Sequence, residues 1–505
     1  MSNPVSSTMR MVAAGWVLVR YDALAPREYA EYLPPAARFF AGFLRLFAAA
    51  EARNGRPGER LARAFERLGP VSIKLGQLLS TRADIFGAVF AEDLSRLKDR
   101  LPPFDGAVAR AEVERSLGRP IDALYSEFGE PVAAASIAQA HRARLHDGRL
   151  VAVKVLRPGV ERRIAGDVDA MRLGARWVER MVPSARRLEP IAFVDTVARS
   201  LELELDFRLE ASAVSELGEI MARDPYMRAP KVVWPGVGRR VLTLEWADGL
   251  PLSDPAALEQ PGVDLRALAD NVIRGFLAQA LDHGTFHADL HEGNLFFAPP
   301  AALTAVDYGI IGRIGPRERR YLAEILWGFI RRDYQRVAEV HFEAGYVPNT
   351  HSVEQFAQAL RAVGEPVFGR LAGEVSMGRL LAQLFEITAV FDMRLRPELV
   401  LLQKTMVTVE GVARRICPDH DIWAAASPVV ERWIARELSP PKRLLEAGRE
   451  MLSALRAIAR AAEAAAAPAP TAVIKQDDSL TRWAVALSLA ALIVAGYAIY
   501  LSQAT

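Results

Sequence analysis

The strand-like segments of this chain are confined to one stretch, which lies between two long helical regions. Residues 120–245 contain three apolar runs with strand character, at 151–156, 231–234 and 241–246. Residues 30–118 show a helical pattern, and residues 265–440 return to one that glycine and proline interrupt. This order predicts an α+β fold in which a strand-containing lobe and a larger helical lobe enclose a cleft. We therefore expect a helical extension at 1–118, a strand-containing lobe at 119–248 and a helical lobe at 249–440.

The last apolar run of the sequence is long enough to cross a membrane. Residues 483–501 carry no charge, and nineteen residues at about 1.5 Å each cover the ~30 Å hydrocarbon core. Arg482 precedes the run and no basic residue follows it, so the positive-inside rule predicts that the bulk of the chain faces the cytoplasm. Residues 441–480 precede it as an amphipathic, arginine-rich helix and a linker. That helix suits either a spacer or a contact with anionic lipid.

The overall composition excludes several classes of protein. The formal net charge is only +2, so bulk charge gives no reason to expect a nucleic-acid partner. Cys417 is the single cysteine, which excludes an internal disulfide framework and a cysteine-based zinc ribbon. Seven of the 63 basic residues are lysines. In a chain that so prefers arginine, a lysine is expected where a compact ammonium group is needed.

Two segments of the strand-containing stretch, residues 120–245, place a lysine and a carboxylate where they can pair. Lys154 lies on an alternating strand, in a Val-Ala-Val-Lys pattern typical of a phosphate-binding lysine. A helix expected over residues 203–211 carries Glu204, Asp206 and Glu210, and Glu210 can orient Lys154. Taken alone, this acidic run is also typical of a solvated helix face.

Two later segments complete the constellation. Asp289 and Asn294 are five residues apart in the sequence HADLHEGN, which is the spacing of a kinase catalytic loop. Asp307 follows an apolar run and precedes Tyr308 and Gly309, a context that suits a metal ligand. The four segments occur in the order that a kinase-like fold requires.

Histidines in this region invite a second interpretation. His283, His287 and His291 are spaced by four residues, which would suit a metal site on one helix face. That geometry needs a continuous helix through Gly284. We expect instead that His287 hydrogen-bonds to backbone and braces the loop.

The expected phosphate loop upstream of Lys154 is rich in alanine where kinases have glycine. Its central residues are Ala133, Ala134, Ala135 and Ser136. An alanine Cβ restricts both the approach of phosphate and positive φ angles, so a nucleotide should sit differently here than under a glycine loop. The alternative is a degraded loop that binds no nucleotide.

These motifs together resemble the UbiB-like atypical kinases, which support ubiquinone biosynthesis. The resemblance covers roughly residues 30–425 and rests on the alanine loop, the prefix Lys74-Leu-Gly76-Gln77, the Glu204/Asp206 pair, HADLHEGN and the Asp307-Tyr-Gly sequence. Leu290 and Glu292 depart from the family pattern, where prolines are common, and Tyr308 replaces a phenylalanine. None of these departures removes a charged group.

The resemblance implies a role for each residue. Lys154 with Glu210 forms the nucleotide ion pair, Asp289 is the catalytic aspartate, and Asn294 and Asp307 are the metal ligands. Lys74 pairs with Glu204, and Gln77 lies over the active site, where the prefix would exclude a bulky protein substrate. The resemblance also implies ATP and Mg²⁺ as cofactors and a single-pass location in the bacterial cytoplasmic membrane. Expected partners are membrane lipid, polyprenyl quinone precursors and quinone-biosynthesis enzymes.

Three functions stay open from the sequence. The favoured one is a membrane-anchored, kinase-like ATPase that acts with quinone precursors. The second is a phosphotransferase acting on a lipid or protein hydroxyl, and the third is a non-catalytic, nucleotide-gated scaffold. Turnover and products with purified protein would separate them.

Overall fold

The structure is a computed structural model of the full chain. It describes residues 4–24, 26–28, 35–49, 54–80, 87–95, 97, 102–181, 186, 189–368, 387, 390–393 and 397–437. Two compact units make up the chain, Met1–Arg436 and Glu437–Thr505, and the sheets of the described residues lie in the first. The expected membrane span at 483–501 and the amphipathic helix at 441–467 lie outside the described residues. Among the described helices, none is both long enough and apolar enough to cross a bilayer.

An antiparallel sheet of four strands carries Lys154. Its strands are β1 (Tyr125–Ala134), β2 (Ala138–Leu145), β3 (Leu150–Leu156) and β4 (Val241–Glu245), paired in the order β1-β2-β3-β4. Val151, Val153 and Val155 of β3 point into the sheet's core, so the alternation puts Lys154 on the opposite face. Helix α7 (Gly106–Leu117) begins at its N-cap Asp105 and adds Val113 to the same core.

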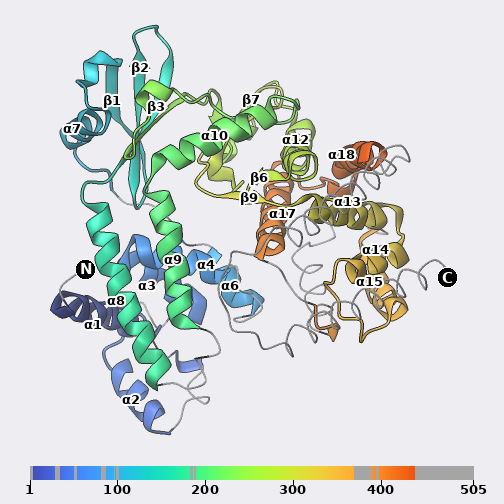
Figure 1. The fold of residues 1–505 in the computed structure, drawn as a ribbon, viewed down its shortest axis with the longest axis horizontal. Helices are drawn as coiled ribbons and strands as arrows, with labels where there is room; N and C mark the ends of the chain where they lie inside the picture. Colours follow the sequence, from blue (N-terminus) through green and yellow to red (C-terminus); the bar gives the residue numbers. More distant parts are fainter. Residues whose placement is uncertain are drawn as a thin grey trace, which may run out of the picture. The chain divides into compact units, whose positions relative to one another are not determined.

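The helical extension forms its own small core. Helices α1 (Pro4–Arg20), α3 (Pro57–Leu68), α4 (Pro70–Ser80) and α6 (Ala88–Ser95) pack around Phe65 and Leu94, and α2 (Pro35–Arg45) contacts α1. Two long helices that follow β3 pack onto this group: α8 (Val160–Met181) against α1, and α9 (Pro190–Glu204) against α4. Figure 1 shows α8 and α9 running side by side from the sheet to the extension.

The expected helix over residues 203–211 is in fact two helices. Helix α9 ends at Glu204, and α10 (Phe207–Met221) begins after Asp206, which adopts an extended conformation. The Asp206 carboxylate accepts a hydrogen bond from the backbone N–H of Arg208, as an N-cap residue does. The prediction of one helix was wrong because an acidic residue with good capping chemistry was counted as part of a helix face.

The helical lobe begins with elements that surround the HADLHEGN sequence. Strand β5 (Leu250–Pro251) and helix α11 (Pro255–Leu258) lead to α12 (Leu265–Ala278) and the wide turn η6 (Gln279–His283). Two small sheets follow, one pairing β5-β7-β8 and the other β6-β9. Their strands are β6 (Thr285–His287), β7 (Leu295–Ala298), β8 (Ala302–Ala305) and β9 (Ile311–Arg313), with the single turn η7 (Glu292–Asn294) before β7.

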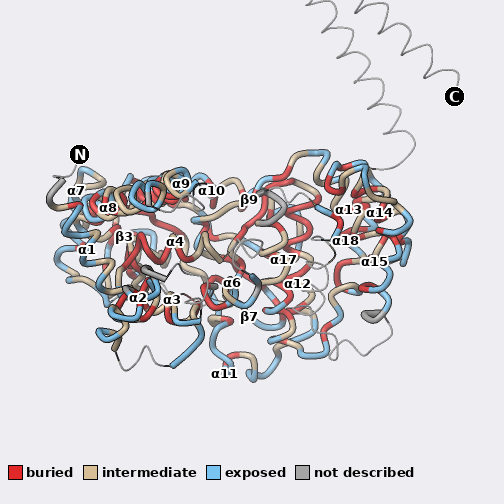
Figure 2. The backbone as a smooth tube through the Cα atoms, turned by 90° about the horizontal axis from the view of Figure 1, so that it is seen from below, coloured by how far each residue is buried: buried red, intermediate tan, exposed pale blue. Residues whose placement is uncertain are grey.

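Five further helices of this lobe lie within the described residues. They are α13 (Pro316–Arg331), α14 (Tyr334–Glu343), α15 (Val353–Phe368), α17 (Pro397–Ile416) and α18 (Ile422–Glu437). Helix α17 packs on α12 and also contacts β9. Buried positions run along β3, α12 and α17 (Figure 2), so these three elements are well packed.

The sheet differs from the sequence expectation in two ways. Strands β1 and β2 were not expected, because β2 is rich in alanine and arginine and Gly129 and Pro131 interrupt β1. The run at 231–234 forms only an isolated bridge from Val232 to Leu244 and a short turn from Trp234. Pairing between neighbouring strands, rather than local propensity, therefore sets the extent of this sheet.

Candidate functional site

Lys154 contacts two carboxylates, one from its own lobe and one from the helical lobe. Its Nζ lies 2.5 Å from Oε1 of Glu210 and 3.0 Å from Oδ1 of Asp307. Lys154 belongs to β3, Glu210 to the first turn of α10, and Asp307 to the loop after β8. The structure thus brings together three of the residues that the sequence singled out, over a separation of 153 residues between Lys154 and Asp307.

The three groups shift one another's pKa values. Burial opposes the ammonium form of Lys154, but the Asp307 and Glu210 carboxylates outweigh it and raise the pKa of Lys154 above its ordinary value. Burial raises the pKa of Glu210, an effect that Lys154 partly offsets. The charge of Lys154 lowers the pKa of Asp307. Lys154 therefore stays charged, as a residue that neutralises phosphate must.

Asp307 is held in an unusual backbone conformation. Its φ is +63°, in the left-handed region that few residues other than glycine adopt. The following Tyr308 is buried, and its hydroxyl donates to the backbone carbonyl of Ala305 at 3.0 Å. The positive φ of this turn lies on Asp307 itself and not on Gly309. Such local strain is typical of residues that a functional site holds in place.

The catalytic loop is braced from within by His287. The backbone N–H of Asp289 donates to Nδ1 of His287 at 3.1 Å, and Nε2 of His287 lies 3.1 Å from the carbonyl oxygen of Val306. Because Nδ1 accepts, Nε2 carries the proton and donates to Val306. His287 is fully buried, and burial lowers its pKa. The expectation that His287 braces the loop through backbone contacts is confirmed.

Asn294 is fixed at the end of the same loop. Its Nδ2 donates to the backbone carbonyl of Asp289 at 3.0 Å, so the amide oxygen faces away from that contact. The backbone N–H of Val306 donates to the Asn294 carbonyl at 2.8 Å, which ties the loop to the segment that carries Asp307. Asp289 keeps a partly exposed carboxylate, 3.7 Å from Nε2 of His291.

The oxygen donors at this site suit a hard divalent cation. Asp307 offers a half-exposed carboxylate and Asn294 an amide oxygen, which are ligands that Mg²⁺ prefers. Glu210 and Asp307 together outnumber Lys154 by one negative charge, so a cation would be favoured there. Within the described residues, no cluster of three or more His, Cys, Asp or Glu side chains forms a metal site. The helical turn that contains His283 ends at Gly284, whose φ is +73°. His283, His287 and His291 therefore do not share one helix face, which argues against a histidine metal site.

The prefix motif lies on α4, and its lysine pairs with the end of α9. Lys74 is buried and forms an ion pair with Glu204, the last residue of α9. Gly76 faces Phe65 and Leu97 so closely that an added Cβ would overlap both side chains. A glycine is thus required for α4 to pack here. Gln77 is half-buried one residue further on.

The two lysines are linked through one short segment. Glu204 holds Lys74, and Glu210, six residues later, holds Lys154. Asp206 lies between them, but it caps α10 and pairs with Arg208 at 2.6 Å rather than facing the prefix. The junction of α9 and α10 therefore connects the extension to the lysine of the sheet.

The alanine loop closes the turn between β1 and β2. Ala133 and Ala134 end β1, while Ala135 and Ser136 form the turn. The Ala135 N–H donates to the carbonyl of Ala138 at 2.8 Å. Arg157 donates from Nε to the Ala135 carbonyl at 2.9 Å, a contact that the sequence did not indicate. The loop is therefore held from the end of β3, three residues after Lys154.

Helix α17 supports the catalytic loop at two points that sequence patterns did not reveal. The hydroxyl of Thr405 lies 3.2 Å from the carbonyl of Ala288, next to Asp289. Arg415 lies 2.5 Å from Glu292, within the HADLHEGN sequence. Both contacts join residues more than 110 positions apart, so only the folded chain shows them.

Comparisons with known proteins agree with this geometry. A family model described as the ABC1 atypical kinase-like domain matches residues 96–341, which include Lys154, Glu210 and the catalytic loop. A second, described as the UbiB helical domain, matches residues 360–421. A protein of Marinobacter nauticus named probable protein kinase UbiB is 39% identical over 439 residues, covering 85% of this chain and 79% of that relative. This chain belongs to the UbiB family of atypical kinases.

Other relatives of the UbiB family give the same result. A probable protein kinase UbiB of Aeromonas hydrophila is 40% identical over 426 residues, covering 83% of this chain and 77% of the relative. The solved structure of a Mycobacterium tuberculosis protein in complex with erythromycin matches with a TM-score of 0.51 at 24% identity, covering 72% of this chain and 93% of that one. That likeness supports the kinase-like α+β fold. The family identifies the chain as a kinase-type enzyme.

Proposed function

We propose that this UbiB-family chain is an ATPase of the atypical-kinase type that supports the biosynthesis of ubiquinone or a related polyprenyl quinone. The observation that carries the proposal is the contact of Lys154 with both Glu210 and Asp307. A lysine held by a helix carboxylate and placed beside a second carboxylate is the arrangement that positions phosphates in kinases. The bound phosphate would replace Asp307 as a partner of Lys154.

Each of the chain's own groups has a part in the proposed reaction. Lys154 neutralises charge on the phosphate chain, and Glu210 holds its ammonium group in position. Asp289, whose carboxylate is partly exposed, orients the attacking water oxygen toward the γ-phosphorus. Water then forms the new P–O bond, and the bond to the β-phosphate oxygen breaks with release of ADP and phosphate. Mg²⁺ bound by Asn294 and Asp307 would supply further positive charge at the phosphate oxygens.

The extension favours hydrolysis over phosphorylation of a protein. Lys74 reaches Glu204 from α4, and Glu204 ends the helix that leads directly to α10. We infer that α4, with Gln77 on it, lies over the mouth of the site and excludes bulky substrates. A small nucleophile such as water reaches the phosphate without displacing the extension.

We further propose that the chain is a single-pass protein of the bacterial cytoplasmic membrane, with residues 483–501 as its anchor and its bulk in the cytoplasm. A polyprenyl quinone precursor partitions into lipid, so a membrane location would bring the enzyme to it. The location is tested by truncating the chain after Asp478 and measuring how the truncated protein divides between the membrane and soluble fractions. Clean release supports the anchor, while unchanged retention in the membrane contradicts it.

One experiment separates the functional alternatives. Purified chain is incubated with ATP and Mg²⁺, with and without vesicles that contain a polyprenylated quinone precursor, and both phosphate release and phosphorylated products are measured. Phosphate release without a phosphorylated product supports the proposal. A phosphorylated lipid or protein would show a phosphotransferase, and nucleotide binding without turnover would show a scaffold.

A further inference from the structure

Arg157 holds both sides of the alanine loop. Its backbone N–H donates to the carbonyl of Ile137 at 2.8 Å, and its side-chain Nε donates to the carbonyl of Ala135 at 2.9 Å. The two carbonyls flank Ser136, in the turn between β1 and β2. One residue directly after β3 therefore fixes the loop that we expect to meet nucleotide phosphates.

The same guanidinium group also reaches the segment through which the chain enters the sheet lobe. Its Nη2 donates to the carbonyl of Pro102 at 2.8 Å, and its central carbon lies 5.6 Å from the centre of the Phe104 ring. Asp105, the next residue in the chain, caps α7, which adds to the core of the sheet. We call residues 102–104 the entry segment. Arg157 thus ties the alanine loop to a segment that α7 anchors.

A second set of buried side chains ties the entry segment to the strands on either side of the loop. Gln139 of β2 is 2% exposed, and its amide accepts from the Phe104 N–H at 2.8 Å and donates to the Phe104 carbonyl at 3.2 Å. Its Nε2 also lies 2.8 Å from Nε2 of His141 and donates to it. Nδ1 of His141 therefore carries the proton and donates to the Gly129 carbonyl of β1 at 2.9 Å. Burial lowers the pKa of His141, which favours the neutral ring that these bonds require.

We propose that Arg157 and Gln139 are positioning residues, which hold the alanine loop in the one conformation that receives the phosphates of a nucleotide. This inference rests on the proposed function, because it takes residues 133–136 as the phosphate loop of an ATPase. Both side chains act on backbone groups of the loop and of the entry segment. A loop that is already ordered loses less conformational entropy when phosphate binds, so its affinity is higher.

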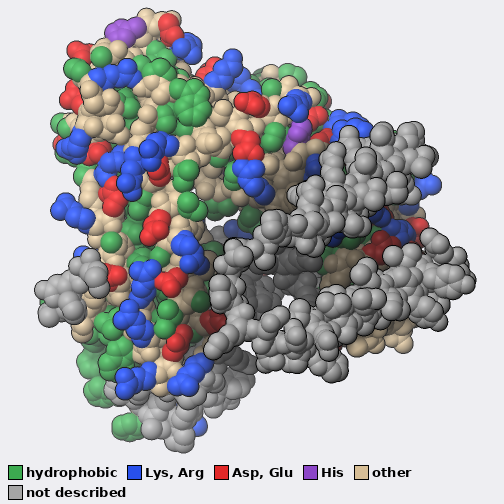
Figure 3. Space-filling view, in the orientation of Figure 1, with side chains coloured by type: hydrophobic (Ala, Val, Ile, Leu, Met, Phe, Trp, Pro, Cys, Tyr) green, Lys and Arg blue, Asp and Glu red, His purple; other side chains and the backbone are tan. Residues whose placement is uncertain are grey.

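The network also connects the loop to the helical extension. The entry segment follows the extension in the chain, and α8, which begins three residues after Arg157, packs against α1 of the extension. Over α8 and α9 basic and acidic side chains are intermingled (Figure 3), and exposed ion pairs contribute little to stability. The bonds of Gln139 and Arg157 are a firmer tie than such surface pairs. Arg157 therefore lies where the two chain connections between the sheet and the extension meet.

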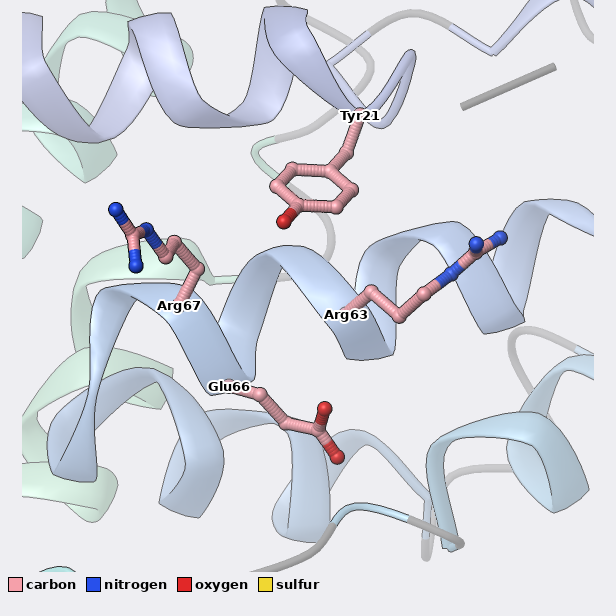
Figure 4. A pocket seen from close by; sticks show the side chains of 4 residues that line it. All are labelled: Tyr21, Arg63, Glu66 and Arg67. Atoms are coloured by element: carbon pink, nitrogen blue, oxygen red, sulfur yellow. The ribbon is translucent and has the colours of Figure 1, made fainter. Parts of the chain in front are cut away.

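The test compares Arg157→Gln and Arg157→Lys with wild type, each as the full chain. Lysine keeps the positive charge but lacks the planar group whose separate N–H donors reach two carbonyls, so it distinguishes positioning from simple attraction of phosphate. Arg67→Gln is the matched control, because Arg67 lies on α3, where it lines a separate pocket with Tyr21, Arg63 and Glu66 (Figure 4). Thermal unfolding verifies that each protein is folded.

Nucleotide affinity and turnover are measured together. Titration calorimetry with ATP and Mg²⁺ gives the dissociation constant, and initial rates of phosphate release give kcat and KM. We expect both Arg157 variants to raise the dissociation constant and KM about tenfold, with kcat changed by less than about threefold. Arg67→Gln should match wild type. A dissociation constant that is unchanged in Arg157→Gln, or restored in Arg157→Lys, would overturn the proposal.

Hydrogen exchange of the nucleotide-free proteins separates this proposal from the proposed function. The amides of residues 104–108 and 133–138 should exchange faster in Arg157→Gln and in Gln139→Met than in wild type, because the bonds that hold both segments are lost. Unchanged exchange beside normal ATP binding would overturn this proposal alone. A wild-type chain that binds no ATP would refute the proposed function and this proposal with it.

Discussion

Lys154 of β3 and Asp307, which follows β8, lie 3.0 Å apart between Nζ and Oδ1. The two residues come from the sheet lobe and the helical lobe, so their contact closes the cleft at the point where phosphates are expected. A ligand that carries both an anion and a cation can replace this ion pair. Its anion takes the place of Asp307 beside Lys154, and its cation takes the place of Lys154 beside Asp307. The Lys154–Asp307 pair therefore lies where we propose that a metal-bound nucleotide binds.

Lys154→Arg should lower ATP turnover by about 100-fold or more. The charge is kept, but a planar guanidinium cannot occupy the place of a compact ammonium between Glu210 and Asp307. Initial rates of phosphate release measure the effect. Lys231→Arg, at an exposed lysine, is the control and should keep the rate. Wild-type turnover in Lys154→Arg would remove Lys154 from the site.

Thr405→Val should lower kcat by about tenfold with little change in KM. Its buried hydroxyl lies 2.9 Å from the Leu401 carbonyl of its own helix and 3.2 Å from the Ala288 carbonyl beside Asp289. Valine removes the contact with Ala288 and so loosens the catalytic loop. Thr405→Ser should restore the rate. Thr408→Val is the matched control, because the Thr408 hydroxyl bonds only to Lys404 of its own helix. Equal losses in both variants would point to a general effect on α17.

Local sequence was sufficient for much of the site. The spacing of Asp289 and Asn294 and the alternation around Lys154 are short-range patterns. The structure pairs Lys154 with Asp307 and ties Asn294 to Val306, the residue before Asp307. Glu210 was also identified, because its helical segment lies between the Lys154 strand and the HADLHEGN sequence, in the order that a kinase-like fold requires. These residues could be predicted because each belongs to a motif whose members are only a few positions apart in the sequence.

Other parts depend on contacts that local sequence does not encode. Thr405 meets Ala288 and Arg157 meets Ala135 only after the chain has folded. Strand β2 forms despite its weak β propensity because β3 pairs along its whole length. Asp206 caps α10. Because Glu204 and Glu210 are also acidic, the sequence predicted that all three residues lie on one helix.

Ala134→Gly should change the relative affinities for ATP and ADP. Glycine frees the backbone at the end of β1, where the loop turns toward Arg157, at a cost of about 1 kcal/mol or less. Titration calorimetry with both nucleotides and an assay of self-phosphorylation measure the effect. Ala302→Gly, at the exposed start of β8, should leave both affinities unchanged. An unaltered Ala134→Gly variant would show that the alanine run does not set nucleotide placement.

Acid should destabilise the helical lobe through His341. This residue is buried on α14, its Nδ1 lies 2.7 Å from the Val337 carbonyl, and burial lowers its pKa from 6.5 to about 4. Between these values the unfolded chain binds a proton that the folded chain does not, so stability falls as pH falls from 6.5 toward 4, by up to about 3 kcal/mol. Urea unfolding at several pH values should show a smaller decrease in His341→Gln than in wild type. His146→Gln, at an exposed histidine, should follow wild type, and identical profiles for all three proteins would exclude His341.

The most direct test of the proposed site is Mg²⁺-dependent phosphate release by Asp307→Asn beside wild type. The amide keeps the size of the side chain but loses the charge that attracts a cation and pairs with Lys154. We predict that wild type releases phosphate in proportion to Mg²⁺ until saturation, and that Asp307→Asn stays at background at every Mg²⁺ concentration while remaining folded. Turnover near the wild-type level in Asp307→Asn, with the same Mg²⁺ dependence, would contradict the account.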